Sequence, residues 1–119
     1  MATKNKEPTR YYSNLQEEYI SKLLDAIKQP SSGSGKFRKG DCINYNASLL
    51  IEAKTTTSDK ESFSIKKEWI TKNKEEAFTQ RVFNGCIAFN FGPNQSNYFV
   101  IDEKLMKFLV EKLEEENKD

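Results

Sequence analysis

The chain of 119 residues contains no histidine. This absence excludes Ser-His-Asp triads, zinc sites with imidazole ligands and acid-base catalysis by imidazole, so carboxylates, lysines and hydroxyl groups remain as candidate catalytic groups. Cysteine is scarce: Cys42 and Cys86 both lie in apparent strands and lack the spacing of metal ligands. We therefore expect two buried free thiols rather than a disulfide or a zinc site.

Long apolar runs are also missing. No segment approaches the roughly 20 apolar residues of a membrane span. The N-terminal segment MATKNKEPTR is not followed by the apolar stretch of a signal peptide. The length suits a single domain, and we expect a cytoplasmic protein without membrane segments.

Charge is distributed unevenly along the chain. Residues 102–119 contain four lysines and seven acidic residues (4 − 7 = −3), and the remainder contains fifteen basic and eleven acidic residues (15 − 11 = +4). A mildly basic body with an acidic end permits a nucleic-acid partner but does not require one.

The hydrophobic periodicity predicts one α/β domain over residues 13–115, preceded by a flexible arm at 1–12 and followed by a frayed acidic tail at 116–119. The expected helices span about 13–29 and 66–81, with a third that begins after an Asp102 N-cap. The expected strands span about 41–45, 48–55, 62–65, 85–92 and 97–101. This α-β-β-β-α-β-β-α order predicts a mixed central sheet flanked by helices.

Two charged residues, Glu52 and Lys54, end one of the most apolar strands. They are two positions apart and therefore share a face. If residues 46–47 form a two-residue turn, counting outward places Asp41 opposite Glu52 on that face, whereas a slip of one residue would separate them. Two converging carboxylates suit Mg²⁺ or Mn²⁺. An adjacent ammonium group fits phosphodiester hydrolysis, because it balances developing negative charge.

An ordinary ion pair on an edge strand is the alternative interpretation. The acid-x-Lys pattern occurs three times, as Glu52-x-Lys54, Asp102-x-Lys104 and Glu116-x-Lys118. The last two belong to the expected C-terminal helix, where charge forms a solvated face. Only the first ends an apolar strand and has an aspartate at the head of the pairing strand.

The stretches GSGKFRKGD, LLIEAKTT and SFSIKKEWITKNKEEA, in this order, resemble the PD-(D/E)xK nuclease superfamily. More narrowly, they are similar to small phage and archaeal Holliday junction resolvases, over about Leu15 to Ile101. Gly40 stands where the family frequently has proline. The resemblance implies a restriction-endonuclease-like α/β fold and a Mg²⁺-dependent DNA endonuclease of a bacterial or archaeal cell, or of its phage. It also implies a role in DNA recombination and selectivity for branched DNA. Two cuts in a two-fold symmetric junction imply a homodimer.

The resemblance assigns roles to individual residues. Asp41 and Glu52 would be metal ligands, and Lys54 the catalytic lysine. A glutamate on the first helix would complete the metal site, with Glu17 as the better match and Glu18 as the alternative; Glu17 is otherwise a solvent-facing helix acid.

Further residues match the loop and the second helix of the family. Ser34 is the nearest equivalent of a loop serine before the aspartate, although it also suits a flexible linker. Trp69 has the family's tryptophan position, where core packing is favoured over base stacking. The expected DNA-contacting residues, which would otherwise be solubilising charge, are Lys36, Arg38, Lys39, Lys66, Lys67 and Lys72.

Two other functions remain open from the sequence. The first is a nuclease of the same superfamily that acts on nicked, flapped or linear duplex DNA. The second is a non-catalytic DNA-binding protein on the same fold. The acid pair argues against the second, because two facing carboxylates repel each other unless a cation or a proton lies between them.

Overall fold

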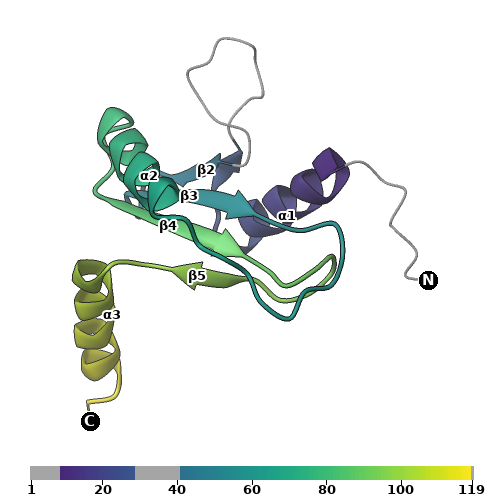
Figure 1. Ribbon diagram of the computed structural model, residues 1–119. Helices are drawn as coiled ribbons and strands as arrows, with labels where there is room; N and C mark the ends of the chain where they lie inside the picture. The colour runs from purple at the N-terminus through teal and green to yellow at the C-terminus, as the bar shows by residue number, and fades with distance from the viewer. Residues whose placement is uncertain (1–8, 29–40, 119) are drawn as a thin grey trace.

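The computed structural model describes residues 9–28 and 41–118 of the chain. They form a small α/β protein with a five-stranded mixed sheet and three helices (Figure 1). The elements are α1 (Thr9–Leu23), β1 (Ile27–Lys28), β2 (Asp41–Asn44), β3 (Leu49–Lys54), α2 (Lys67–Thr79), β4 (Asn84–Phe89), β5 (Tyr98–Val100) and α3 (Glu103–Glu116).

The strands follow one another in the order β1-β2-β3-β4-β5, so β3 is the central strand. Only β3 and β4 are parallel, and α2 makes the crossover between them. Gly85 on β4 permits the close approach of this helix, because a Cβ there would collide with the side chain of Asn73. Asn73 is buried, and its Nδ2 donates a hydrogen bond to the main-chain oxygen of Cys86 (3.3 Å).

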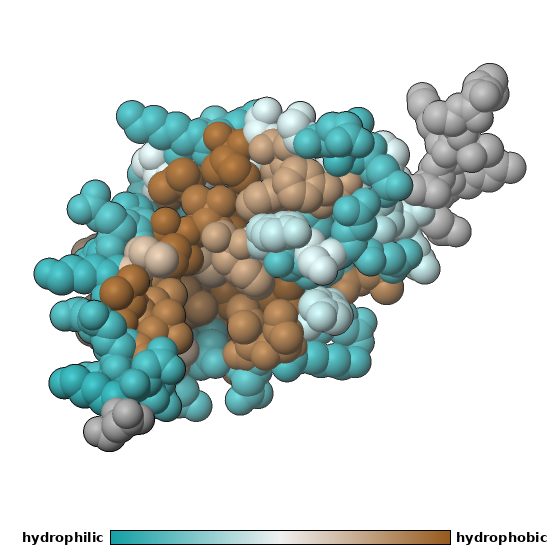
Figure 2. Space-filling model, turned by 90° about the horizontal axis from the view of Figure 1, so that it is seen from below, coloured by the Kyte–Doolittle hydropathy of each residue, from teal (hydrophilic) through white to brown (hydrophobic). Residues whose placement is uncertain are grey.

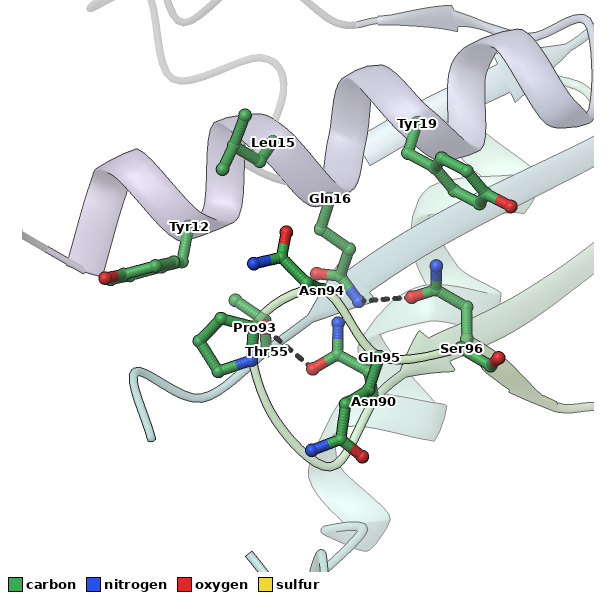
Figure 3. Close-up of a pocket in the computed structure, with 11 residues that line it drawn as sticks. Tyr12, Leu15, Gln16, Tyr19, Thr55, Asn90, Pro93, Asn94, Gln95 and Ser96 are labelled. Atoms are coloured by element: carbon green, nitrogen blue, oxygen red, sulfur yellow. Dashed lines mark hydrogen bonds between the residues drawn. The ribbon is translucent and has the colours of Figure 1, made fainter. Parts of the chain in front are cut away.

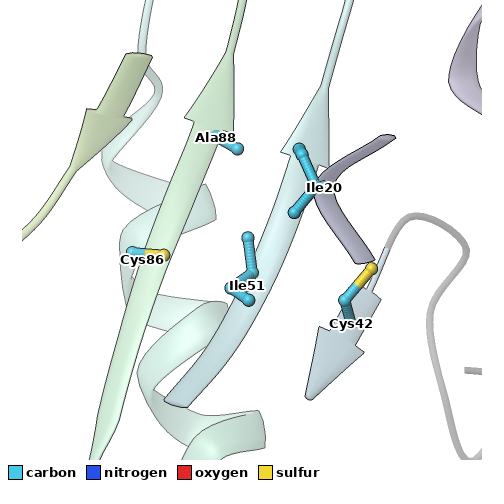
Figure 4. Close-up of a cluster of buried hydrophobic side chains, with 5 residues drawn as sticks. All are labelled: Ile20, Cys42, Ile51, Cys86 and Ala88. Atoms are coloured by element: carbon cyan, nitrogen blue, oxygen red, sulfur yellow. The ribbon is translucent and has the colours of Figure 1, made fainter. Parts of the chain in front are cut away.

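The two faces of the sheet bury separate apolar clusters, because side chains alternate along each strand. On one face, Ile20 of α1 packs against Cys42, Ile51, Cys86 and Ala88 (Figure 4). The thiols of Cys42 and Cys86 are free and buried, which confirms the expectation from the sequence.

On the opposite face, Ile43 and Leu50 pack against Ala77 of α2 and Val82, which follows it. Asp41 is two positions from Ile43 on β2, and Glu52 is two positions from Leu50 on β3. Residues two apart on a strand share a face, so both carboxylates lie on the α2 side of the sheet. The core thus fixes which layer the strand-borne carboxylates face.

The first helix differs from its expected bounds. It begins at Thr9, within the segment expected to be an arm, and ends at Leu23 rather than near residue 29. Asp25 has a φ of 51°, and the N–H of Ala26 donates to the oxygen of Ser21 (2.8 Å), which closes the helix early. The chain then forms β1, in which Ile27 pairs with Ile43.

The strand expected over residues 62–65 was wrong. Residues 62–65 pair with no strand of the sheet; β4, against which Phe63 packs, is already paired on both sides, with β3 and β5. Phe63 instead packs its ring on Phe89 (5.1 Å between centroids) and on Trp69 (6.2 Å). The expected order of elements agrees with the structure only because β1 takes the place of this strand.

The last helix projects from the body beyond β5 (Figure 1). Asp102 is its N-cap, as expected, and accepts a hydrogen bond from the N–H of Leu105 at Oδ1 (2.9 Å). No residue of α3 is buried, and no other described element packs extensively against it. None of the helices in the described part of the chain is long and apolar enough to cross a membrane.

Candidate active site

The hairpin register brings Asp41 opposite Glu52, which confirms the pairing expected from the sequence. The turn that sets this register is closed by two hydrogen bonds: the N–H of Ala47 donates to Asn44 Oδ1 (2.8 Å), and the N–H of Ser48 donates to the oxygen of Tyr45 (3.2 Å). Directly opposed residues share a face, so the two carboxylates lie side by side.

Both carboxylates are withdrawn from solvent. Asp41 is 0% exposed and Glu52 is 2% exposed. β3 is the central strand of the sheet, so the edge position assumed in the alternative interpretation is wrong, although Glu52 and Lys54 do form an ion pair. Acidic side chains are rarely this deeply buried, which makes the pair an unusual feature of the core.

Lys54 extends from the same face, at the end of β3. Its Nζ lies 3.0 Å from Glu52 Oε2, and 31% of its side chain is exposed, compared with 3% for that of Glu52. The ammonium group therefore lies at the boundary between the buried acids and solvent. A ligand that approaches from solvent would contact the ammonium group of Lys54 before it reached the two buried carboxylates.

Trp69, which the sequence assigned to core packing, contacts the lysine. Lys54 Nζ lies 4.5 Å from the centroid of the Trp69 ring, within the range of a cation–π interaction. Lys66 Nζ lies 5.8 Å from the same ring. Lys54 is thus held between a carboxylate and an aromatic face. The only sequence signal for this contact is the place of Trp69 in the first turn of the helix that follows β3.

Glu17 lies on α1, which covers the opposite face of the sheet, and is buried. The thiol of Cys42 points to the main-chain oxygen of Glu17, 3.7 Å away. Burial, followed by the negative charges of Glu17 and Asp41, raises the pKa of Cys42 to about 11. Both carboxylates are therefore near this one thiol. Glu18 is exposed and pairs with Lys22 (3.6 Å), so burial favours Glu17 of the two candidates.

The donor set is suited to a hard divalent cation. Asp41 and Glu52 offer carboxylate oxygens, which Mg²⁺ and Mn²⁺ prefer, and Glu17 lies buried one layer away. Within residues 9–28 and 41–118, no three Asp, Glu, Cys or His side chains are already gathered as a metal-binding group. The structure brings Asp41, Glu52 and Lys54 together, and it leaves Glu17 on the neighbouring helix.

The remaining predicted site residues lie either at and near the start of α2 or outside the described residues. Lys66, Lys67 and Lys72 are exposed at and after the start of α2, and Lys72 pairs with Glu68 one turn away. The other four expected contacts lie outside the described residues; they are Ser34, Lys36, Arg38 and Lys39.

Comparisons with known proteins found no match. No protein-family model, curated protein or solved structure matches the chain. The functional argument therefore rests on the residues and their geometry.

Proposed function

We propose that this protein is a Mg²⁺-dependent DNA endonuclease that is selective for branched DNA, such as four-way junctions. The observation that carries the proposal is the buried, in-register pair of Asp41 and Glu52 with Lys54 Nζ at 3.0 Å from Glu52. Selectivity for branched DNA, and the assignment to the PD-(D/E)xK superfamily, rest on the resemblance of the sequence motifs.

The residues divide the work of phosphodiester hydrolysis between them. Asp41 and Glu52 would hold the cation, with Glu17 as a third carboxylate. When bound, the cation would polarise the phosphoryl oxygen and acidify a coordinated water. Lys54 would balance the negative charge that develops on the phosphate, and it is oriented for this by Glu52 and Trp69.

A structural ion pair is the competing explanation, and burial argues against it. Two acids lie opposite each other on adjacent strands, and Lys54 lies beside one of them. Facing carboxylates favour a cation or a proton between them. A divalent cation would remove this repulsion, which is the physical reason to expect one.

The exposed lysines of α2 supply a surface for the DNA backbone. Lys66 and Lys67 lie at the start of the helix whose Trp69 contacts Lys54, so they flank the candidate site. Contacts of lysine with phosphate carry no sequence information and weaken as salt increases. We expect binding to branched DNA to fall steeply between low and physiological salt.

The decisive experiment compares a labelled four-way junction with a linear duplex of the same sequence, in Mg²⁺ or in EDTA. We expect Mg²⁺-dependent cleavage of the junction only, and no cleavage by Glu52→Ala. Equal cleavage of both DNAs would indicate a nuclease with a broader substrate range. Binding without cleavage under all conditions would indicate a non-catalytic DNA-binding protein and would overturn the proposal.

The proposal includes a homodimer, because two cuts in a symmetric junction require two sites. The exposed apolar stripe of α3 supports this part. Met106, Leu109, Val110 and Leu113 are between 41% and 60% exposed. Seen from below, apolar side chains gather over a broad area of the molecule (Figure 2). Monomers rarely leave a large contiguous apolar patch in water, so a partner is expected on this surface.

Charge favours a second copy of α3 as that partner. The first half of the helix carries Lys104 and Lys107 with one acid, Glu103 (2 − 1 = +1), and the second half carries four glutamates with one lysine, Lys112 (1 − 4 = −3). A two-fold axis across the helix makes the two copies antiparallel, which places the lysines of each copy beside the glutamates of the other. Packing stripe on stripe would then cover both apolar faces.

Sedimentation at tens of micromolar tests the dimer. We expect twice the chain mass of 13.8 kDa for the wild type and the mass of one chain for Leu109→Lys combined with Leu113→Lys. Phe83→Lys is the matched control, because Phe83 is 89% exposed but lies outside α3. A wild type with the mass of one chain would refute the interface, and so would a double variant that remains dimeric.

A further inference from the structure

A groove of about 410 Å³ lies between α1 and the segment 90–97, which connects β4 to β5 (Figure 3). Thr55, which directly follows Lys54, also lines it. None of the described residues that line the groove is charged. The groove is therefore unsuited to bind a phosphate by charge and suited to a neutral, polar ligand.

Hydrogen bonds hold the polar side chains of the groove in place. Gln16 Nε2 donates to the main-chain oxygen of Lys54 (2.7 Å) and to Asn97 Oδ1 (3.0 Å). Thr55 Oγ1 donates to Asn90 Oδ1 (2.8 Å). The two contacts of Gln16 tie the groove to the end of β3, so it adjoins the strand end that carries the catalytic lysine.

Two polar groups of this network make no hydrogen bond within the described residues. Gln16 is 5% exposed, and its Oε1 is buried without a hydrogen-bond partner in the described structure. Asn97 uses its oxygen for Gln16, and no described residue accepts a hydrogen bond from its Nδ2. Buried polar atoms are normally satisfied, so this arrangement points to a ligand or a water in the groove. The Nδ2 group of Asn97, a donor, complements an acceptor on the edge of a nucleobase.

Two tyrosines provide apolar walls beside these amides. Tyr12 and Tyr19 lie two turns apart on α1, on either side of Gln16 (Figure 3). The side chain of Tyr19 is exposed even though it lines the groove. Stacking of a base on an aromatic ring is favourable for every base and depends little on sequence.

We propose that this groove binds one unpaired nucleobase of the DNA strand, with Tyr19 stacked on its face and Asn97, which Gln16 holds in place, at its edge. The inference rests on the proposed nuclease function, and it adds a base-binding subsite beside the phosphate site. Branched and bulged DNA exposes unpaired bases at low cost, whereas a continuous duplex must be unstacked to supply one. The groove would thus contribute to selectivity for non-duplex DNA.

The test measures binding in EDTA, so that it does not depend on cleavage. The probe is a duplex with a single bulged 2-aminopurine, and the matched probe carries the same base paired. We expect the wild type to quench the bulged probe and to bind it more tightly. Tyr19→Ala and Asn97→Ala should each weaken this binding about tenfold, within the usual range for one stacked or hydrogen-bonded base.

Tyr45→Ala is the control, because Tyr45 is a similarly exposed tyrosine in the β2–β3 turn. It should bind as the wild type does, and thermal unfolding should show that all variants are folded. The proposal is overturned if the bulged probe is not bound or quenched, or if both groove variants retain wild-type affinity. It is also overturned if Tyr45→Ala weakens binding equally. Quenching in EDTA without cleavage in Mg²⁺ would retain the base site and reject the nuclease.

Discussion

Glu52-x-Lys54 and Asp102-x-Lys104 have the same pattern of an acid and a lysine two residues apart, but they occupy opposite environments. Glu52 lies on the central strand, 2% exposed, with Lys54 at 3.0 Å and Asp41 directly across. Asp102 lies before α3 with a side chain that is 40% exposed, and its carboxylate caps the helix and contacts Lys74 (3.4 Å).

The difference shows that the neighbours of an acid decide its chemistry. Asp102 has enough partners of its own: the N–H of Leu105, followed by Lys74, holds its pKa below the ordinary value. Such an acid is stabilised as a carboxylate and has no need of a metal. The Glu52 pair lies in a buried layer with a second acid opposite, which is the condition under which a cation is favoured.

The largest expected effect is on the rate of cleavage, and it should distinguish Lys54 from Lys104. Lys54→Met should reduce the rate of junction cleavage by on the order of 10² to 10³, because a preorganised charge at the reacting phosphate is lost. Lys104→Met should retain the wild-type rate at enzyme concentrations that keep the proposed dimer assembled, since Lys104 lies on the exposed helix α3 and not beside the acid pair. Single-turnover cleavage at saturating enzyme measures both. Equal rates for the two variants would place Lys54 outside the chemistry.

A smaller effect is expected at Trp69. Trp69→Leu removes the ring that lies 4.5 Å from Lys54 Nζ, and a cation–π contact of about 1 kcal/mol corresponds to a rate decrease of roughly five- to tenfold. Because Trp69 acts through the lysine, we expect kcat to fall with little change in KM. Trp69→Phe keeps an aromatic face and should restore much of the rate; a loss that Phe does not restore would indicate a packing role alone.

The smallest effect concerns stability at Asp102. Asp102→Ala removes the N-cap and should decrease the free energy of unfolding by about 1 kcal/mol at neutral pH, without changing cleavage. The pKa of Asp102 is lowered in the folded state, so its contribution is present above the ordinary pKa of aspartate and is lost as the pH falls through the folded-state value. Urea unfolding should therefore show the two proteins converging in acid.

Asp102→Asn is the control for this stability effect. Asparagine also caps helices but does not titrate. Asp102→Asn should therefore keep most of the free energy of unfolding, and the contribution of its cap should not be lost as the pH falls. If Asp102→Ala unfolds like the wild type at neutral pH, the capping hydrogen bond contributes nothing measurable. A loss of cleavage in either variant would instead connect α3 to the site.

Much of the sheet could be predicted because its signals are local. The turn at residues 46–47 fixes the hairpin register, and the confirmed pairing of Asp41 with Glu52 follows from counting outward. The early end of α1 could not be predicted, because it depends on the positive φ of Asp25 and on the pairing of Ile27 with β2. Phe63 has strand-like surroundings in the sequence, but its ring packs on Phe89 and Trp69, which are distant in sequence or belong to another element.

Part of the candidate site could likewise be predicted from the sequence, and part could not. The sequence indicated the two acids and the lysine, since strand alternation and hairpin counting are sufficient to place them on one face. It did not indicate that Trp69 lies on Lys54, or that Gln16 joins the end of β3 to the β4–β5 loop, because these contacts connect separate elements.

The sequence by itself determined that three helices form, most of the strands and the acid pair, because periodicity and turn chemistry act over a few neighbouring residues. Only the tertiary structure decided that Glu52 is buried on a central strand while Asp102 stays in solvent, and that the stripe of α3 remains uncovered. The physical reason is that the burial of a residue depends on contacts with elements that are distant in the sequence. Two identical short patterns therefore do not reveal which of them will be buried.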